Sequence, residues 1–310
     1  MTELLRGELK KVRRWRLFQG TLVLLVGALI LVAWRNQVSL GVQEDVVAGL
    51  DGQLEELKSA GVSGDELAAY EGEAALLRSG LSRARQLVRL DGSLEMVSGI
   101  LLTAPGMLVG LVIGAGLVGL ELAGPRRTVL LAGVGRSRLA LALVLSLGAL
   151  SLGLAILSAI VASAANAGFS WVYHRPIGAV HVDLASAWAF AAGAAGLWFW
   201  ALVGALAAAL THSPLGGILA AGAFVGIDSI VARGVHGIGR FLIGPNILVL
   251  ARSSSRTAST ALLIPRVWFE SWGDGFPFLG ALAASGVLMA FALSASALLT
   301  WLWNEEDVIP

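Results

Sequence analysis

Six apolar stretches run along the chain, each bounded by charged residues, by proline or by a short polar cluster. Each is long enough for an α-helix, which rises about 1.5 Å per residue, to cross a hydrocarbon core about 30 Å thick. The predicted membrane spans are residues 17–34, 96–120, 139–164, 184–210, 214–232 and 276–303. This pattern predicts a single all-α domain, residues 1–310, that crosses the membrane six times.

Two connections between the spans have helical patterns of their own. In the first, residues 36–95, apolar residues recur at helical spacing, and Ser-Gly-Asp-Glu at 63–66 has the form of a capping box that begins a second helix. The recurring residues are Val46, Val47, Leu50, Leu54 and Leu57. We therefore expect an external helical hairpin. In the second, residues 233–275, the apolar segment 241–250 is too short to span and is interrupted by Gly-Pro-Asn, which predicts short external or re-entrant helices.

The positions of Lys and Arg predict the orientation of the spans. These residues cluster in 1–16 and in 121–138, and short segments rich in them remain cytoplasmic. Eleven acidic residues lie between positions 44 and 95, against six basic residues between 35 and 89, which favours the outer side for the hairpin. Six spans then return the acidic tail, 304–310, to the cytoplasm. We expect a multi-pass protein of the cell membrane with both termini cytoplasmic.

Composition excludes several classes of protein. Hydrophobic residues make up 56% of the chain and charged residues only 14%, against about 25% in an ordinary soluble domain. The absence of cysteine excludes disulfides, thiol catalysis and cysteine metal sites. None of the three lysines follows a glycine, so the chain has no P-loop for ATP. It also lacks the common serine-hydrolase and zinc-protease motifs, and we predict neither an enzyme nor a nucleic-acid-binding protein.

Few ionisable residues suggest chemistry. His174, His181 and Asp183 share one predicted external loop, but their spacing matches no metal motif, so no metal site is predicted. Asp228 lies near the outer end of the fifth span. It is either part of a substrate or ion pathway or an interfacial charge that pairs with Arg233. Glu121 lies where the second span leaves the membrane and faces the cytoplasmic arginines.

The segment that begins at Glu121 has the most specific pattern of the chain. By its residues alone it is a short amphipathic cytoplasmic segment, or simply a charged turn held near the headgroups by its arginines. The pattern nevertheless resembles that of the permease subunits of type-2 ABC transporters, a family of mostly exporters. The matching residues are Glu121, Gly124, Leu130, Leu131, Gly133, Val134, Arg136, Arg138 and Leu139. Pro125, Gly135 and Leu143 replace the Thr, Ser and Lys that are usual there.

Both ends of the chain also resemble this family. Leu4, Leu5, Leu9 and Val12 can face lipid while basic neighbours meet anionic headgroups, which is similar to the amphipathic N-terminal helix of such permeases. The segment 303–309 is similar to their short acidic tails. The hairpin between the first two spans is longer than the first external loop that is usual in the family.

The resemblance implies an ATP-driven exporter in which two permeases, identical or homologous, form the translocation pathway and bind two cytosolic ABC ATPase subunits. ATP and Mg would bind to those subunits, with no cofactor on this chain. Segment 121–138 would be the coupling helix that docks on the ATPase. Its residues are Glu121, Gly124, Arg126, Arg127, Leu130, Leu131, Val134, Arg136 and Arg138. The second and fifth spans would form the dimer interface and the pathway.

Two other functions remain open. The chain could be a membrane-anchored assembly or sensor protein whose hairpin binds a partner. A secondary transporter is the other alternative, but it needs charged residues deep in the spans and, in many folds, repeated halves, and the sequence shows almost none of the former and no convincing repeat.

Overall fold

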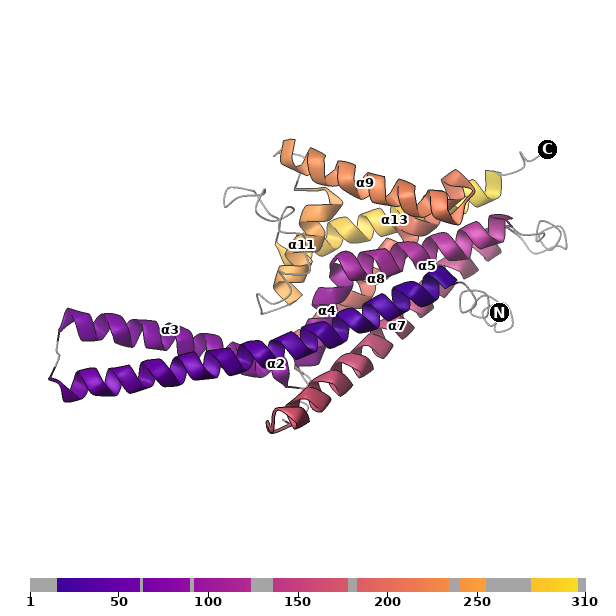
Figure 1. Ribbon diagram of the computed structural model, residues 1–310. Coiled ribbons are helices and arrows are strands. Elements are labelled where there is room, and N and C mark those ends of the chain that lie inside the picture. The colour runs from indigo at the N-terminus through magenta and orange to yellow at the C-terminus, as the bar shows by residue number, and fades with distance from the viewer. Residues whose placement is uncertain are drawn as a thin grey trace.

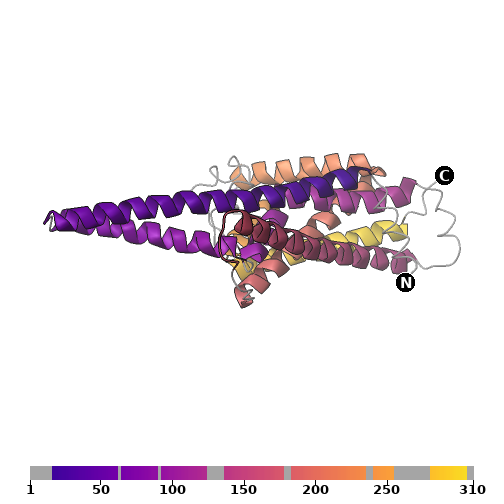
Figure 2. The same ribbon diagram turned by 60° about the horizontal axis from the view of Figure 1, so that its bottom comes forward.

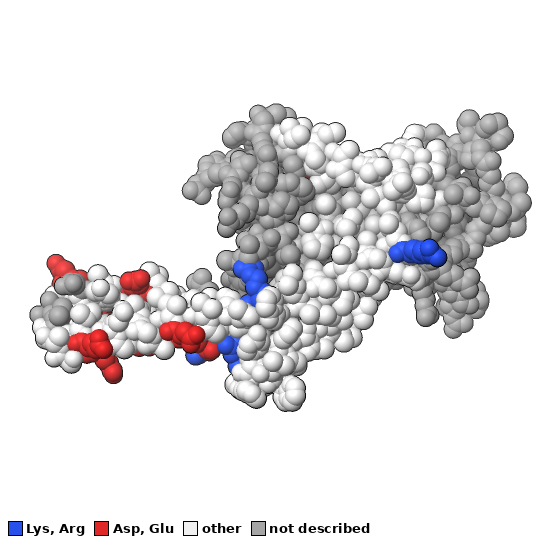
Figure 3. Space-filling model, viewed as in Figure 1, with Lys and Arg blue, Asp and Glu red and all other residues white. Residues whose placement is uncertain are grey.

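The computed structural model describes residues 16–61, 64–89, 92–123, 136–177, 183–234, 240–254 and 280–305. In these ranges the chain is helical and contains no strand, which confirms the predicted all-α class. A bundle of helices carries one long hairpin that projects from it (Figure 1). The bundle and the hairpin lie along one line when the molecule is turned (Figure 2). Acidic side chains gather on the hairpin, whereas the visible face of the bundle carries few charges (Figure 3).

Five helices or helix pairs of the described residues have the length and apolarity of membrane spans. They are α2 (Arg16–Ser59), α7 (Arg136–Val172), α8 (Leu184–Thr211), α13 (Ala281–Glu305) and the bent pair α4 (Gly92–Leu102) and α5 (Ala104–Ala123). In α9 (Pro214–Gly234) the apolar part, Pro214–Asp228, is shorter than a full span. The structure therefore shows an all-α membrane protein with four or five candidate spans, and the sixth span stays a prediction. The short helix α11 (Ile243–Ser254) follows α9.

The second predicted span is broken. Helices α4 and α5 meet at an angle of 62° around Thr103, where a single continuous helix was expected over 96–120. Pro105 explains the break, since a proline has no N–H to donate and its ring clashes with the carbonyl of the residue four positions earlier. Thr103 then begins α5, because its carbonyl accepts a bond from the N–H of Met107 at 2.9 Å.

Helix α2 is continuous where the sequence predicted a boundary between a membrane span and a separate helix of the hairpin. The first span and the first helix of the hairpin form one helix of 44 residues, which is about 66 Å long at 1.5 Å per residue. Polar residues at 35–37 mark the end of the apolar stretch but do not interrupt a helix, and no proline follows them. The hairpin turns after Gly61, whose φ of 74° lies in the left-handed region that favours glycine at a helix end.

The hairpin pairs the outer part of α2 with α3 (Asp65–Val88) through a heptad pattern of buried residues. Leu40, Val47 and Leu54 of α2 are spaced by seven residues and are at most 8% exposed. On α3 the buried and half-buried residues alternate at spacings of three and four, which is the pattern of a coiled coil. They are Ala74, Leu77, Leu81, Ala84 and Val88. The predicted helical hairpin is therefore present as an antiparallel coiled coil.

Helix α8 lies at the centre of the bundle, in contact with α4, α5, α7, α9, α11 and α13. Glycines allow the closest approaches, as small residues commonly do between membrane helices. A Cβ added to Gly110 of α5 would lie 2.5 Å from the Cβ of Trp200, and one added to Gly114 would overlap the carbonyl of Ala201. A Cβ added to Gly193 of α8 would lie 2.8 Å from the Cα of Ser98 in α4. The backbones of α4, α5 and α8 therefore pack directly on one another.

Replacing Gly114 with leucine should destabilise this contact. The added side chain has no space against the backbone of α8, and overpacking of this kind costs about 1–3 kcal/mol or more. Thermal unfolding of the detergent-purified protein should show a lower midpoint for Gly114→Leu. Gly153→Leu on α7 is the matched control, because a Cβ at Gly153 meets nothing within 4 Å. An equal loss in both variants would contradict the assigned role of Gly114.

Candidate functional site

Three ion pairs follow one edge of the hairpin. Glu44 pairs with Arg85 at 3.3 Å, Asp51 with Arg78 at 2.6 Å, and Lys58 with Glu71 at 2.9 Å. Along each helix the partners are spaced by seven residues, so all three pairs lie on the same side of the coiled coil. We call this side the ion-paired edge. These pairs were not predicted from the sequence. The signal that could have identified them is the seven-residue spacing of the charged positions 44, 51 and 58 and of 71, 78 and 85.

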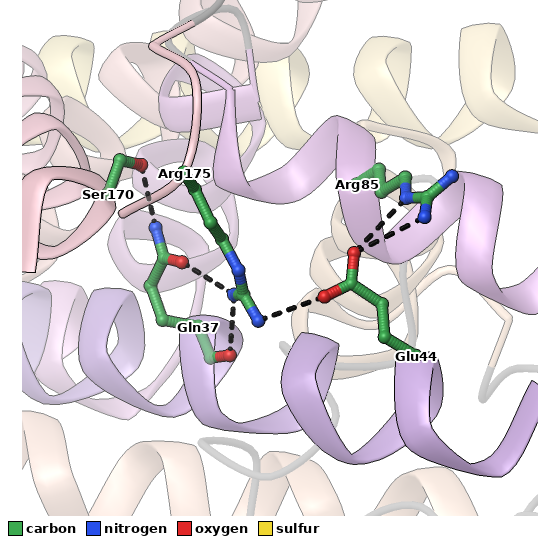
Figure 4. Close-up of polar contacts among 5 residues, drawn as sticks. All are labelled: Gln37, Glu44, Arg85, Ser170 and Arg175. Carbon is green, nitrogen blue, oxygen red and sulfur yellow. Dashed lines mark hydrogen bonds and ion pairs between the residues drawn. The ribbon is translucent and has the colours of Figure 1, made fainter. Parts of the chain in front are cut away.

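Arg175 connects this edge to the bundle (Figure 4). One guanidinium nitrogen, Nη1, donates to the backbone oxygen and to Oε1 of Gln37, both at 2.8 Å. The other, Nη2, donates to Glu44 Oε2 at 3.1 Å, and the same carboxylate binds Arg85 through its second oxygen. The amide of Gln37 donates in turn to the Ser170 hydroxyl at 2.9 Å. Residues from α2, α3, α7 and the loop after α7 thus form one polar cluster, which we call the Arg175 joint.

The end of α7 places Arg175 over α2. The N–H of Arg175 donates to the carbonyl of Ser170 and the N–H of His174 to that of Trp171, which is the Schellman pattern of helix termination. His174 takes the left-handed conformation, with φ of 53°, that this pattern requires. Gly41 leaves room for the guanidinium, because a Cβ there would lie 3.3 Å from Arg175 Nη2.

The burial of Arg175 makes the joint stronger than the outer ion pairs. Its side chain is only 17% exposed, whereas the side chains of Arg78 and Arg85 are 55% and 61% exposed. Exposed ion pairs contribute about 0–1 kcal/mol, and charge-assisted bonds shielded from water contribute more. The joint can therefore hold the hairpin at a fixed angle to α7, and a movement of α7 would be transmitted to the hairpin. It offers no evident catalytic chemistry.

Asp228 has a clear structural environment. Its buried carboxylate accepts hydrogen bonds from the N–H groups of Ile243 at 3.2 Å and Gly244 at 2.8 Å, at the start of α11. Unpaired N–H groups and the helix dipole make a helix start a favourable position for a carboxylate. Asp228 therefore ties α9 to α11. Its expected partner Arg233 has no described side chain, and a pathway role for Asp228 stays a prediction.

The predicted coupling residues fall at the gap between α5 and α7. Glu121 belongs to the last turn of α5, and Arg136 and Arg138 to the first turn of α7, but their side chains lie outside the described part of the structure. The following residues lie wholly outside the described ranges: Gly124, Arg126, Arg127, Leu130, Leu131 and Val134. The described ends of α5 and α7 on either side of this gap lie at the end of the bundle opposite the hairpin, where α2 begins and α13 ends (Figure 1).

The residues weighed for a metal site do not come together where they are described. His174 ends α7, and Asp183 caps α8 by accepting a bond from the N–H of Ser186 at 2.7 Å. His181 lies outside the described residues, as does the predicted N-terminal helix, 1–16, except for Arg16 at the start of α2. Within the described ranges no group of three potential ligands is placed to hold a metal ion.

Comparison of this chain with protein-family models, with curated proteins and with solved structures found no match.

Replacing Arg175 with alanine should loosen the base of the hairpin. The variant leaves Gln37 and Glu44 without a partly buried donor, which costs about 1–3 kcal/mol in local stability. Hydrogen exchange of amides around Gln37 and Glu44 should accelerate accordingly. The control, Arg78→Ala, removes an exposed pair outside the joint that is worth about 0–1 kcal/mol. Equal acceleration in the two variants would show that the joint has no special role.

The tip of the hairpin should respond to acid. The hydrogen bond and the charge of Lys58 hold the pKa of the exposed Glu71 carboxyl below its ordinary value of 4.5. A lowered pKa contributes stability above the ordinary value, and that contribution is lost as the pH falls through the lowered one. Glu71→Gln should therefore accelerate exchange at the tip at about pH 6, and the effect should disappear as the pH falls through the lowered pKa. An effect that persists in acid would exclude this pair as its cause.

Proposed function

We propose that this chain is the membrane subunit of an ATP-driven exporter. Two copies, or one copy and a homologue, form the translocation pathway, and separate cytosolic ABC ATPase subunits bind ATP and Mg. The chain itself is not an enzyme in this proposal. The sequence support is the family resemblance around residues 121–138, and the structural support is the broken helix inside the bundle.

The broken helix is the observation that favours transport over anchoring. A membrane anchor needs only continuous helices, whereas discontinuous helices buried in the bundle are typical of transporters. Helix α4 is buried along nearly its whole length, including the polar residues Ser93 and Ser98. Thr103, at the break after α4, is buried as well. The bend of 62° gives the second span two rigid parts that can change their relative angle. We propose that this change of angle accompanies opening of the pathway.

Helix α5 connects the break with the proposed ATPase-binding segment. Helix α5 runs from Ala104 at the break to Ala123, directly before the proposed coupling segment. A push on segment 121–138 would therefore act along α5 on the break, while the tight contact of α5 with α8 keeps these two helices together. In the proposed topology α9 is the fifth of six spans, and both termini are cytoplasmic.

Pairing of two copies within the membrane would use α9 more than α5. The described side chains of α5 are almost all buried inside the chain, which leaves little surface for a partner. Helix α9 presents exposed apolar side chains along one side, and a second copy could cover them. They are Leu215, Leu219, Phe224, Ile227 and Ile230.

The second candidate is an assembly or sensor protein. The Arg175 joint favours it, because a rigid connection between hairpin and bundle would convey binding of an external partner to the membrane helices. The two functions differ on the cytoplasmic side: only the exporter needs an ATPase there.

Replacing Leu130 and Leu131 with aspartate should abolish co-purification with the cognate ATPase while membrane insertion continues. Aspartate removes the apolar contact proposed for the coupling helix, and both residues lie outside the predicted spans. Ala75→Asp, an exposed change on the hairpin, is the control and should leave the complex intact. Persistence of the complex in the Leu130→Asp/Leu131→Asp variant would refute the coupling-helix assignment. A purified chain with no ATPase partner would favour the sensor.

A further inference from the structure

The two edges of the hairpin have different chemistry. The ion-paired edge holds all three ion pairs within the hairpin described above. By the heptad positions of α2 and α3, three strongly exposed apolar residues of the hairpin lie on the opposite edge. They are Val42, Val46 and Leu76, which are 58%, 48% and 74% exposed. We call this side the open edge. Gly49 and Gly80 belong to it as well, and a Cβ at either would meet nothing within 4 Å.

The ion pairs fix which residues of the two helices lie at the same height. Because Glu44 is beside Arg85 and Asp51 is beside Arg78, Val46 lies within about one helical turn of the height of Gly80. By the same register, Leu76 lies within about one turn of Gly49. Two of the three protruding side chains, Val46 and Leu76, thus lie within about one turn of a glycine on the other helix.

We propose that the open edge is the surface through which a second copy of this chain docks. Two copies in one membrane project their hairpins from the same side, so a two-fold axis between them runs parallel to the hairpins. Rotation about that axis places α2 of one copy against α3 of the other at equal height. Val46 then lies within about one turn of the partner's Gly80 and Leu76 within about one turn of the partner's Gly49, and the two hairpins form an antiparallel four-helix bundle.

This pattern fits a second copy better than an unrelated helix, because the surface is complementary to itself. The exposed side of α2 also continues from the hairpin towards the bundle, through Val38 and Trp34 to Leu31, and no described segment covers it. At the tip of the hairpin, charge repulsion opposes the contact between copies. Glu56 and Glu73 lie on the open edge and would face each other between copies, so the contact is closest near the membrane and strengthens with salt.

The inference deepens the proposed function, which needs two copies, but its evidence comes from the hairpin alone. The chain contains no cysteine, which makes cross-linking simple. We would co-express two differently tagged full-length chains, one Val46→Cys and the other Gly80→Cys, and oxidise the membranes. A disulfide-linked pair carrying both tags is the expected result. The matched control joins Ala48→Cys and Ser82→Cys, which are exposed at similar heights on the ion-paired edge and should not cross-link.

Leu76→Asp, introduced into both chains, should lower the cross-linked fraction by about tenfold, because the contact would have to bury an unpaired carboxylate. Ala75→Asp should leave that fraction unchanged. Absence of the Val46–Gly80 cross-link, or equal cross-linking on the two edges, would overturn the proposal, as would insensitivity to Leu76→Asp. Chains that also carry Leu130→Asp and Leu131→Asp should still cross-link, so a failure here is distinct from a failure of ATPase binding.

Discussion

One uninterrupted helix joins the two parts of this molecule. Because α2 contains both a membrane span and half of the hairpin, its backbone hydrogen bonds continue through the boundary between apolar and polar sequence. The hairpin therefore cannot tilt independently of the span unless α2 itself bends. Everything else near the boundary supports this continuity: α3 packs on α2 above it, and the Arg175 joint ties α2 to α7 at it.

The bundle and the hairpin are stabilised in different ways. In the bundle, glycines bring helix backbones into direct contact, since a hydrophobic driving force between helices is weak in lipid. In the hairpin, which is rich in charge, a buried heptad of leucine, valine and alanine excludes water and ion pairs mark one edge. The Arg175 joint lies where these two modes meet. Its donors and acceptors satisfy one another at a level where the chain passes from an apolar to a polar environment.

The sequence predicted the all-α class and the hairpin, because apolar length and helical spacing are local properties. It predicted the ends of helices less well. Polar residues at 35–37 suggested a boundary that the helix ignores, whereas Pro105 breaks a stretch that apolarity alone made continuous. Contacts between distant residues could not be predicted: Arg175 and Gln37 are 138 positions apart, and no periodicity relates them. Asp228 was singled out by its rarity, but its bonds to the start of α11 depend on how α9 and α11 pack.

The position of the joint at the base of the hairpin sets a mechanical scale. From Gln37 to the end of α2 at Ser59 the helix extends about 33 Å at 1.5 Å per residue. A rotation of about 10° at the joint would therefore displace the tip by about 6 Å, which is more than one helical turn. Small rearrangements of the bundle, which leave its packing unchanged, would therefore displace the tip of the hairpin by several ångströms. The reverse also holds: a modest force at the tip exerts a large torque on the ends of α2 and α7.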